Sequence, residues 1–177
     1  MITRYPRWRQ VEPQGPVVYE TLMMTGLVPP TEWHAILRLI VAALAGAAIG
    51  WNRQMKGKPA GLRTHMLVSV GAALFGLIPL LVARSEAAAT LGRVIQGVAT
   101  GIGFLGAGEI IHQIRRKPEQ PLVYGLTSAA AIWLTAAIGM AAACGLWVIT
   151  ALTVVLALAI LSGAGRLEER FPPYRQG

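Results

Sequence analysis

Aspartate is absent from the 177 residues, cysteine occurs once, and only 14% of the residues are charged. A soluble domain has about 25% charged residues, whereas 54% of this chain is hydrophobic and its mean hydropathy is +0.53. The single Cys144 provides neither a disulfide framework nor a metal-binding motif. The shortage of charge argues against a soluble domain and predicts an integral membrane protein.

Known catalytic patterns are also missing. The sequence has no Walker loop, no His-Glu metal helix, and no serine followed by a plausible histidine and acid. We therefore expect a protein that is not an enzyme, with no cofactor and no resident metal. The net charge of +8 could indicate nucleic acid, but the basic residues lie between apolar runs. They predict cytoplasmic loops that face anionic lipid, and no nucleic-acid partner.

Four apolar runs follow Trp33 and predict five transmembrane helices, and hence an all-α membrane protein. The fourth run, residues 126–164, has no charged residue and as one helix would be about 58 Å long. A bilayer core is about 30 Å thick, so this run must contain two spans, with the break at Cys144 and Gly145. The first three runs are residues 36–51, 66–83 and 94–111.

The charges of the loops predict the orientation. Lysines and arginines are concentrated in residues 52–65, in residues 112–121 and after Gly165, and basic loops stay on the cytoplasmic side. This pattern places the N-terminus outside and the C-terminus inside. We divide the chain into an irregular N-terminal extension (1–31), a five-helix membrane domain (32–165) and a short cytoplasmic tail (166–177).

The stretch GIGFLG, from Gly101 to Gly106, matches the dinucleotide-binding pattern G-x-G-x-x-G. That pattern needs a preceding strand and a following helix, yet here it lies inside an apolar run. Close helix packing is the better interpretation, because small residues let membrane helices approach one another. Gly97 and Gly101 have the GxxxG spacing, as do Gly46 and Gly50. We expect the glycine-rich third helix to be central, crossed closely by its neighbours or by a second copy.

Glu109 is the only acid inside a predicted span, and ionisable residues within membranes are functional candidates. Two interpretations stay open: a structural partner of Arg53, Arg63 or Arg115, or a gating or coupling acid in a polar pocket beneath the loops. One carboxylate is little for a magnesium pathway, although nearby oxygens could contribute. The histidines are expected at the ends of spans, where an interfacial role is more common than metal binding: His34, His65 and His112.

Several stretches resemble the MgtC/SapB family of bacterial inner-membrane proteins. They are AGLRTHMLVSVGAALF (60–75), GIGFLGAG (101–108), GLTSAAAIW (125–133) and the opening RLIVAALAGAAIGWNR (38–53). The resemblance covers roughly residues 38–161. It implies a five-helix domain, self-association, and links to magnesium limitation, pathogen survival inside host cells and control of membrane ATPases. The motif residues and functional candidates are Asn52, Arg53, Gly61, Leu62, Arg63, Thr64, Gly101, Gly103, Phe104, Gly106, Gly108, Glu109, Gly125, Leu126 and Thr127.

The chain departs from the family pattern at two positions. Asn52 stands where the family usually has an acid, and Glu109 stands where an uncharged residue is common. We also expect no soluble C-terminal domain of the kind that some members carry. The resemblance implies a non-enzymatic protein that acts through helix contacts as a regulator or accessory subunit. The alternative is a transporter or channel for a small solute or ion. The expected partners are membrane lipid and either a second copy or a larger membrane complex.

The N-terminal extension lies outside the resemblance. It combines arginines and aromatic residues, which are enriched at interface hot spots, with several prolines. A docking arm and a loose terminus are both open interpretations. The residues that would dock a partner are Arg4, Tyr5, Arg7, Trp8, Arg9 and Tyr19.

Overall fold

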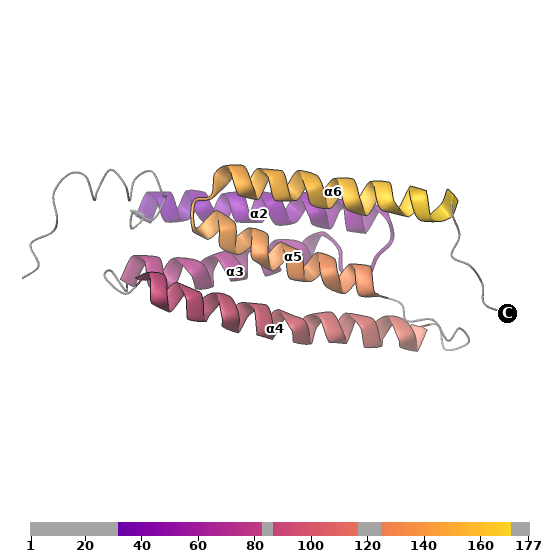
Figure 1. Ribbon diagram of the computed structural model, residues 1–177, viewed down its shortest axis with the longest axis horizontal. Helices are drawn as coiled ribbons and strands as arrows, with labels where there is room; N and C mark the ends of the chain where they lie inside the picture. The colour runs from indigo at the N-terminus through magenta and orange to yellow at the C-terminus, as the bar shows by residue number, and fades with distance from the viewer. Residues whose placement is uncertain (1–31, 83–86, 117–124, 171–177) are drawn as a thin grey trace, which may run out of the picture.

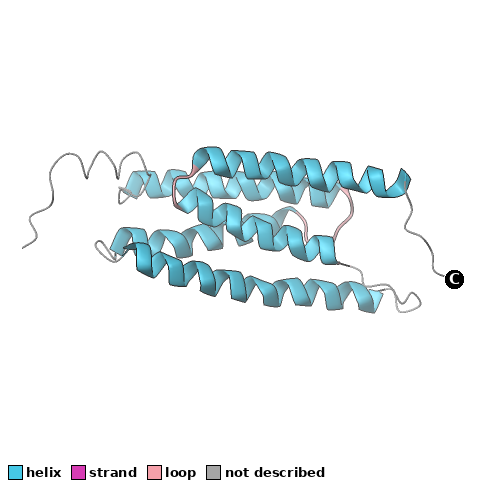
Figure 2. Cartoon of the chain, viewed as in Figure 1, coloured by secondary structure: helices cyan, strands magenta, loops and turns pink. Residues whose placement is uncertain are grey.

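The computed structural model describes residues 32–82, 87–116 and 125–170, with side chains placed for 33–82, 87–111 and 125–163. This part of the chain consists of helices joined by short connections and has no strand (Figure 2). The helices are α2 (Glu32–Met55), α3 (Leu62–Val82), α4 (Ala87–Arg116), α5 (Leu126–Ala143) and α6 (Trp147–Arg170). The predicted all-α class is confirmed for these residues.

Four helices are long and apolar enough to cross a membrane, and they make the chain a multi-pass membrane protein. The spans are Trp33–Met55, Leu62–Val82, Ala87–Ile111 and Leu126–Ala143. The apolar part of α6 is shorter, Trp147–Gly163, so a fifth crossing stays a prediction. The predicted break in the last apolar run is confirmed: Gly145 lies between α5 and α6 with φ of +74°, a value that favours glycine.

The G-x-G-x-x-G stretch lies wholly inside α4. A dinucleotide-binding turn needs a strand, a sharp turn and a helix start at these glycines. A continuous helix through Gly101 and Gly106 provides none of these. The rejection of a Rossmann site is therefore supported by the fold of this segment.

Consecutive helices run antiparallel, and α5 occupies the centre of the bundle (Figure 1). Among the described helices, α5 contacts all four others, whereas α4 contacts only α3 and α5. In the apolar window of α4, 6% of the positions are buried, against 56% in α5. Our expectation of a central glycine-rich helix is therefore wrong for the single chain, and packing of α4 against a second copy stays a prediction.

Close helix crossings hold α2, α3 and α5 together. A Cβ atom added at Gly46 would lie 2.6 Å from the carbonyl oxygen of His65, and one at Gly50 would lie 2.7 Å from Cα of Leu62. A Cβ at Gly139 of α5 would collide with the backbone of Ser69 in α3. Small residues let backbones approach where lipid provides no hydrophobic drive between helices. The GxxxG prediction is therefore confirmed in α2.

The antiparallel order gathers related segments at each end of the bundle. One end holds the end of α2, the starts of α3 and α5 and the ends of α4 and α6 (Figure 1). We call it the basic end, because the connection 56–61 carries Lys56 and Lys58 and α3 begins with Leu62 and Arg63. The opposite end is called the far end. Helix α6 continues to Arg170, so the tail predicted from residue 166 begins as helix.

Candidate functional site at the basic end of the bundle

Arg53 is buried where α2 ends, with only 3% of its surface exposed. Its Nη2 atom donates a 2.5 Å hydrogen bond to Oγ of Ser128, in the first turn of α5. A charge at membrane depth needs polar partners. The bond joins two stretches that the family resemblance singles out, 38–53 and 125–133, and fixes the end of α2 on the start of α5.

His65 and Ser69 lie one helical turn apart on α3 and are both fully buried. Nδ1 of His65 lies 2.9 Å from the carbonyl oxygen of Gly61. A carbonyl only accepts, so Nδ1 of His65 carries the proton of this hydrogen bond. Within the described residues, His65 Nε2 and Ser69 Oγ have no hydrogen-bond partner. His65 is the fourth residue of α3, at a helix end as predicted, and it is buried in the bundle, so its interfacial role stays a prediction.

Glu109 lines a cavity of about 370 Å³ between the start of α3 and the end of the α4 span. Its carboxylate interacts electrostatically with Arg53 and with His65. The cavity agrees with the interpretation of Glu109 as a gating acid in a pocket. The interaction with Arg53 agrees with the interpretation of Glu109 as a structural partner of an arginine. Both roles stay predictions. The cavity is lined by Pro59, Ala60, Thr64, Phe104, Leu105, Gly108, Glu109 and Ile132.

The end of α2 is also attached to α6. Nδ2 of Asn52 donates a 2.9 Å hydrogen bond to Oγ of Ser162, and Nζ of Lys56 donates to the carbonyl oxygen of Leu161. Asn52 therefore bonds with α6, while its neighbour Arg53 bonds with α5. An acid at position 52, as the family pattern has, would accept at the Ser162 hydroxyl instead of donating to it.

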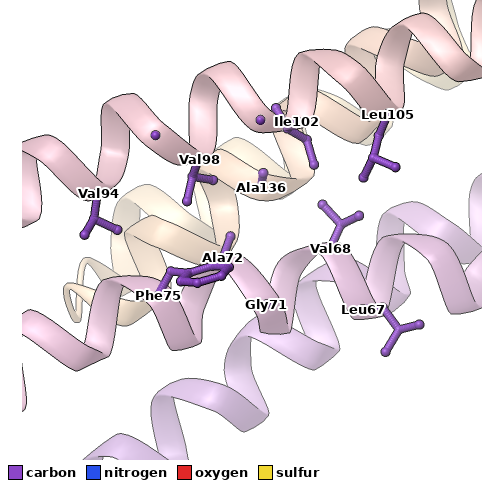
Figure 3. Close-up of a pocket in the computed structure, with 12 residues that line it drawn as sticks. Leu67, Val68, Gly71, Ala72, Phe75, Val94, Val98, Ile102, Leu105 and Ala136 are labelled. Atoms are coloured by element: carbon purple, nitrogen blue, oxygen red, sulfur yellow. The ribbon is translucent and has the colours of Figure 1, made fainter.

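A larger cavity of about 650 Å³ lies between α3 and α4 and adjoins the smaller one, since Leu105 lines both. Its walls are apolar side chains of the two helices, and Ala136 of α5 lies behind them (Figure 3). Gly71, Gly97 and Gly101 add lining positions without side chains. The seam between α3 and α4 thus has a long apolar cavity and, at the basic end, a shorter cavity that includes Thr64 and Glu109.

The structure distributes the other predicted residues around this seam. Gly61 accepts from His65, and Thr64, Phe104 and Gly108 line the smaller cavity. Gly101 lines the larger cavity, and buried Gly106 packs against Ala129 of α5. Two of the remaining predicted residues, Leu62 and Gly125, are half-buried, and the others are exposed: Arg63, Gly103, Leu126 and Thr127.

Two of our expectations lie outside the described residues. The N-terminal docking residues fall in the undescribed segment 1–31, and the side chains of His112 and Arg115 are likewise not described. Sequence reasoning missed Ser69 and the bond of Ser128 to Arg53. A signal existed, because a serine inside a span usually marks a hydrogen bond between helices.

The far end of the bundle also contains a buried arginine that bonds with a neighbouring helix, Arg38. Nη1 of Arg38 donates a 2.7 Å hydrogen bond to the carbonyl oxygen of Ala143, the last residue of α5. A cation at a helix C-terminus is favourable because the last carbonyls carry partial negative charge. Burial raises the pKa of the adjacent Cys144 thiol, although the Arg38 charge opposes this. The thiol therefore stays neutral at pH 7.

Long apolar helices, close glycine crossings and buried arginines that bond across the bundle define a multi-pass membrane protein whose polar side chains gather at its ends. Among the described residues, no group of three or more His, Cys, Asp or Glu side chains is arranged to hold a metal ion. The MgtC family matches residues 39–170. The chain belongs to that family.

Curated relatives share 42–45% identity with this chain. Protein SrpB of Synechococcus elongatus is 45% identical over 115 residues, which are 62% of this chain and 63% of SrpB. YhiD of Escherichia coli K12, whose name provisionally assigns it magnesium transport, is 43% identical over 57% of this chain and 46% of its own length. Protein MgtC of Salmonella typhimurium is 42% identical over 57% of this chain and 39% of its own.

The chain thus spans between 39% and 63% of the length of these relatives. No solved structure matches it significantly.

Proposed function

We propose that the protein is a non-enzymatic regulator or accessory subunit in the bacterial inner membrane, acting through helix contacts with another membrane protein. The relatives' names connect the family with magnesium, so we propose magnesium homeostasis as its setting. The observation that carries the proposal is the outer face of α4, which points away from the bundle. This face consists of Arg93, Gln96, Thr100, Gly103 and Ala107, all exposed.

The spacing of these residues is three, four, three and four, which places them on one side of a helix. The span Ala87–Ile111 is centred on Ala99, so the exposed amide of Gln96 lies near mid-membrane. A polar amide in hydrocarbon is costly without a partner. Thr100 bonds with its own helix, at the carbonyl oxygen of Gln96. A second helix could approach closely at the small residue Gly103 and form a hydrogen bond with Gln96.

A photo-crosslinking residue at position 100 tests this proposal in living cells. We expect covalent capture of a different membrane protein from position 100 and little from position 155, an exposed position on α6. Gln96→Leu and Gly103→Leu should reduce the capture and impair growth at limiting magnesium. Capture of lipid alone at position 100 would contradict a protein contact, and capture of a second copy would make the contact homomeric.

The transporter alternative is favoured by the Glu109 cavity and the buried polar groups behind it. Purified protein in liposomes separates the two functions. A regulator moves no magnesium, whereas a transporter gives saturable flux that Glu109→Gln reduces. Saturable flux by the purified protein would replace the regulatory proposal with the transport one.

A further inference from the structure

The seam between α3 and α4 is amphiphilic along its length. Its larger cavity is lined by aliphatic side chains, glycines and Phe75, as Figure 3 shows for the labelled residues. Its smaller cavity, on the other side of Leu105, has a mostly apolar lining that includes two polar residues, Glu109 and Thr64. A long apolar cavity beside a short cavity that contains an acidic residue matches the shape of a lipid.

The apolar compartment is about as long as one leaflet is thick, and it extends from the side of the basic end past the middle of the span at Ala99. On α4 the lining residues run from Val94 to Leu105, and these two residues are about 16 Å apart along the helix. The hydrocarbon core of a bilayer is about 30 Å thick, so one leaflet contributes roughly half of it. Glu109 lies two residues before the end of the span at Ile111, at the level where lipid headgroups begin.

The charged residues at the basic end indicate which type of lipid headgroup the smaller cavity would bind. Glu109 lines the smaller cavity, and a carboxylate suits an ammonium group. Two exposed basic residues adjoin the lining in the sequence, because Lys58 precedes Pro59 and Arg63 precedes Thr64. Basic side chains suit a phosphate. An ammonium beside a phosphate is the chemistry of an ethanolamine headgroup.

We propose that this seam binds one phospholipid with an amine headgroup, taken from the leaflet at the basic end. Its acyl chain fills the larger cavity, its ammonium group bonds with Glu109, and its phosphate lies within reach of Lys58 and Arg63. The carboxylate of Glu109 has two oxygens and about four acceptor sites, so its interactions with Arg53 and His65 remain in place. The site is independent of the outer face of α4.

Lipid binding to the purified, delipidated full-length protein tests the site by native mass spectrometry. The probes are phosphatidylethanolamine, phosphatidylcholine and phosphatidylglycerol with identical acyl chains. The unchanged protein should bind the ethanolamine lipid best. Equal binding of all three, or a preference for the glycerol lipid, overturns the headgroup assignment.

Two variants fill the apolar compartment without touching the protein backbone. A Cβ atom at Gly71 or Gly101 meets nothing within 4 Å, so Gly71→Leu and Gly101→Leu extend into the cavity. Each displaced acyl methylene lowers affinity roughly fourfold, and we expect a loss of at least about tenfold. Gly103→Leu is the matched control: it also has open space but lies outside the cavity, and its lipid binding should be unchanged. Unchanged binding in both filling variants overturns the site.

The headgroup test uses Glu109→Gln and, as a second variant, Thr64→Val. Both should lose the preference for the ethanolamine lipid over the choline lipid while keeping the acyl contact. Circular dichroism in the same detergent shows whether each variant is folded. If one variant is unfolded, the headgroup preference of the other variant is the test. A photo-crosslinker at Val98 should capture lipid. Capture of a second copy or of another protein's helix would assign the cavity to that occupant and overturn the proposal.

Discussion

Helices α4 and α5 are neighbours in the chain and contact each other, yet they lie in opposite environments. Both are apolar enough to span a membrane, but 6% of the α4 window is buried against 56% of the α5 window. Helix α4 contains six glycines and α5 contains one. The single Gly139 of α5 meets a neighbouring backbone, whereas in α4 only Gly106 has any neighbouring atom within 4 Å of an added Cβ.

This difference shows that neither hydropathy nor glycine density separates core from surface in a membrane bundle. Lipid tails are as apolar as leucine, so a lipid-facing helix and a central helix can have similar mean hydropathy, as α4 and α5 do. What distinguishes α5 is that Gly139 lies where a backbone crosses. The four substitutions below test this contrast, in descending order of expected effect.

Gly139→Leu should be the most damaging change. A side chain there collides with the backbone of Ser69, so α3 and α5 must separate. We expect a loss of at least about 3 kcal/mol in the free energy of unfolding, measured by denaturant titration in detergent micelles. A Gly139→Leu protein with parental stability would show that the crossing of α3 and α5 is not close.

Arg38→Met should come second. The change leaves the carbonyl oxygen of Ala143 without its charged donor in a buried place, and such losses cost about 1–3 kcal/mol. Arg93→Met on exposed α4 is the matched control and should change stability by less than about 0.5 kcal/mol. The same micelle titration applies, and equal losses at the two arginines would contradict the structural role of Arg38.

Ser128→Ala should have a smaller effect. It removes the hydroxyl that accepts from Arg53, which should cost about 1–2 kcal/mol because one partner is charged. The neighbouring Thr127 is exposed, so Thr127→Ala serves as the control and should be nearly neutral. A thermal unfolding temperature that falls equally in both variants would refute the selective importance of Ser128.

Gly103→Leu should have the smallest effect on stability. Its Cβ atom meets nothing within 4 Å in the single chain, so we expect a change within about 0.5 kcal/mol. The same variant should still lose the proposed partner contact in cells. A large loss of stability in purified, monomeric protein would show that α4 is packed in the core at position 103, as α5 is at position 139.

The sequence was sufficient to predict the helical class, five helices among the described residues and the break near Gly145. Those features follow from run length and charge, which act locally. The position of α4 was not predictable, because GxxxG spacing indicates that a close approach is possible without saying from which side. Gly46 and Gly50 do meet a neighbouring helix, and Gly97 and Gly101, with the same spacing, do not.

The candidate site was predicted in part. Arg53, Thr64 and Glu109 were identified as motif residues or as an unusual acid, and the structure places them around the basic end. The buried positions of His65 and Ser69 were not predictable. Their burial depends on which face of α3 is turned toward α2 and α5, and the sequence of α3 is apolar on all sides.

The two arginine bonds have a consequence for the order in which the protein is made. Arg53 and Arg38 bond with residues 75 and 105 positions later in the chain. Translation at about 5–20 residues per second separates Arg38 from its acceptor by roughly 5–20 s. During most of that interval α2 carries two arginines whose hydrogen-bond acceptors in α5 have not yet been made. The polar contacts of α2 are therefore completed only after α5 has been synthesised.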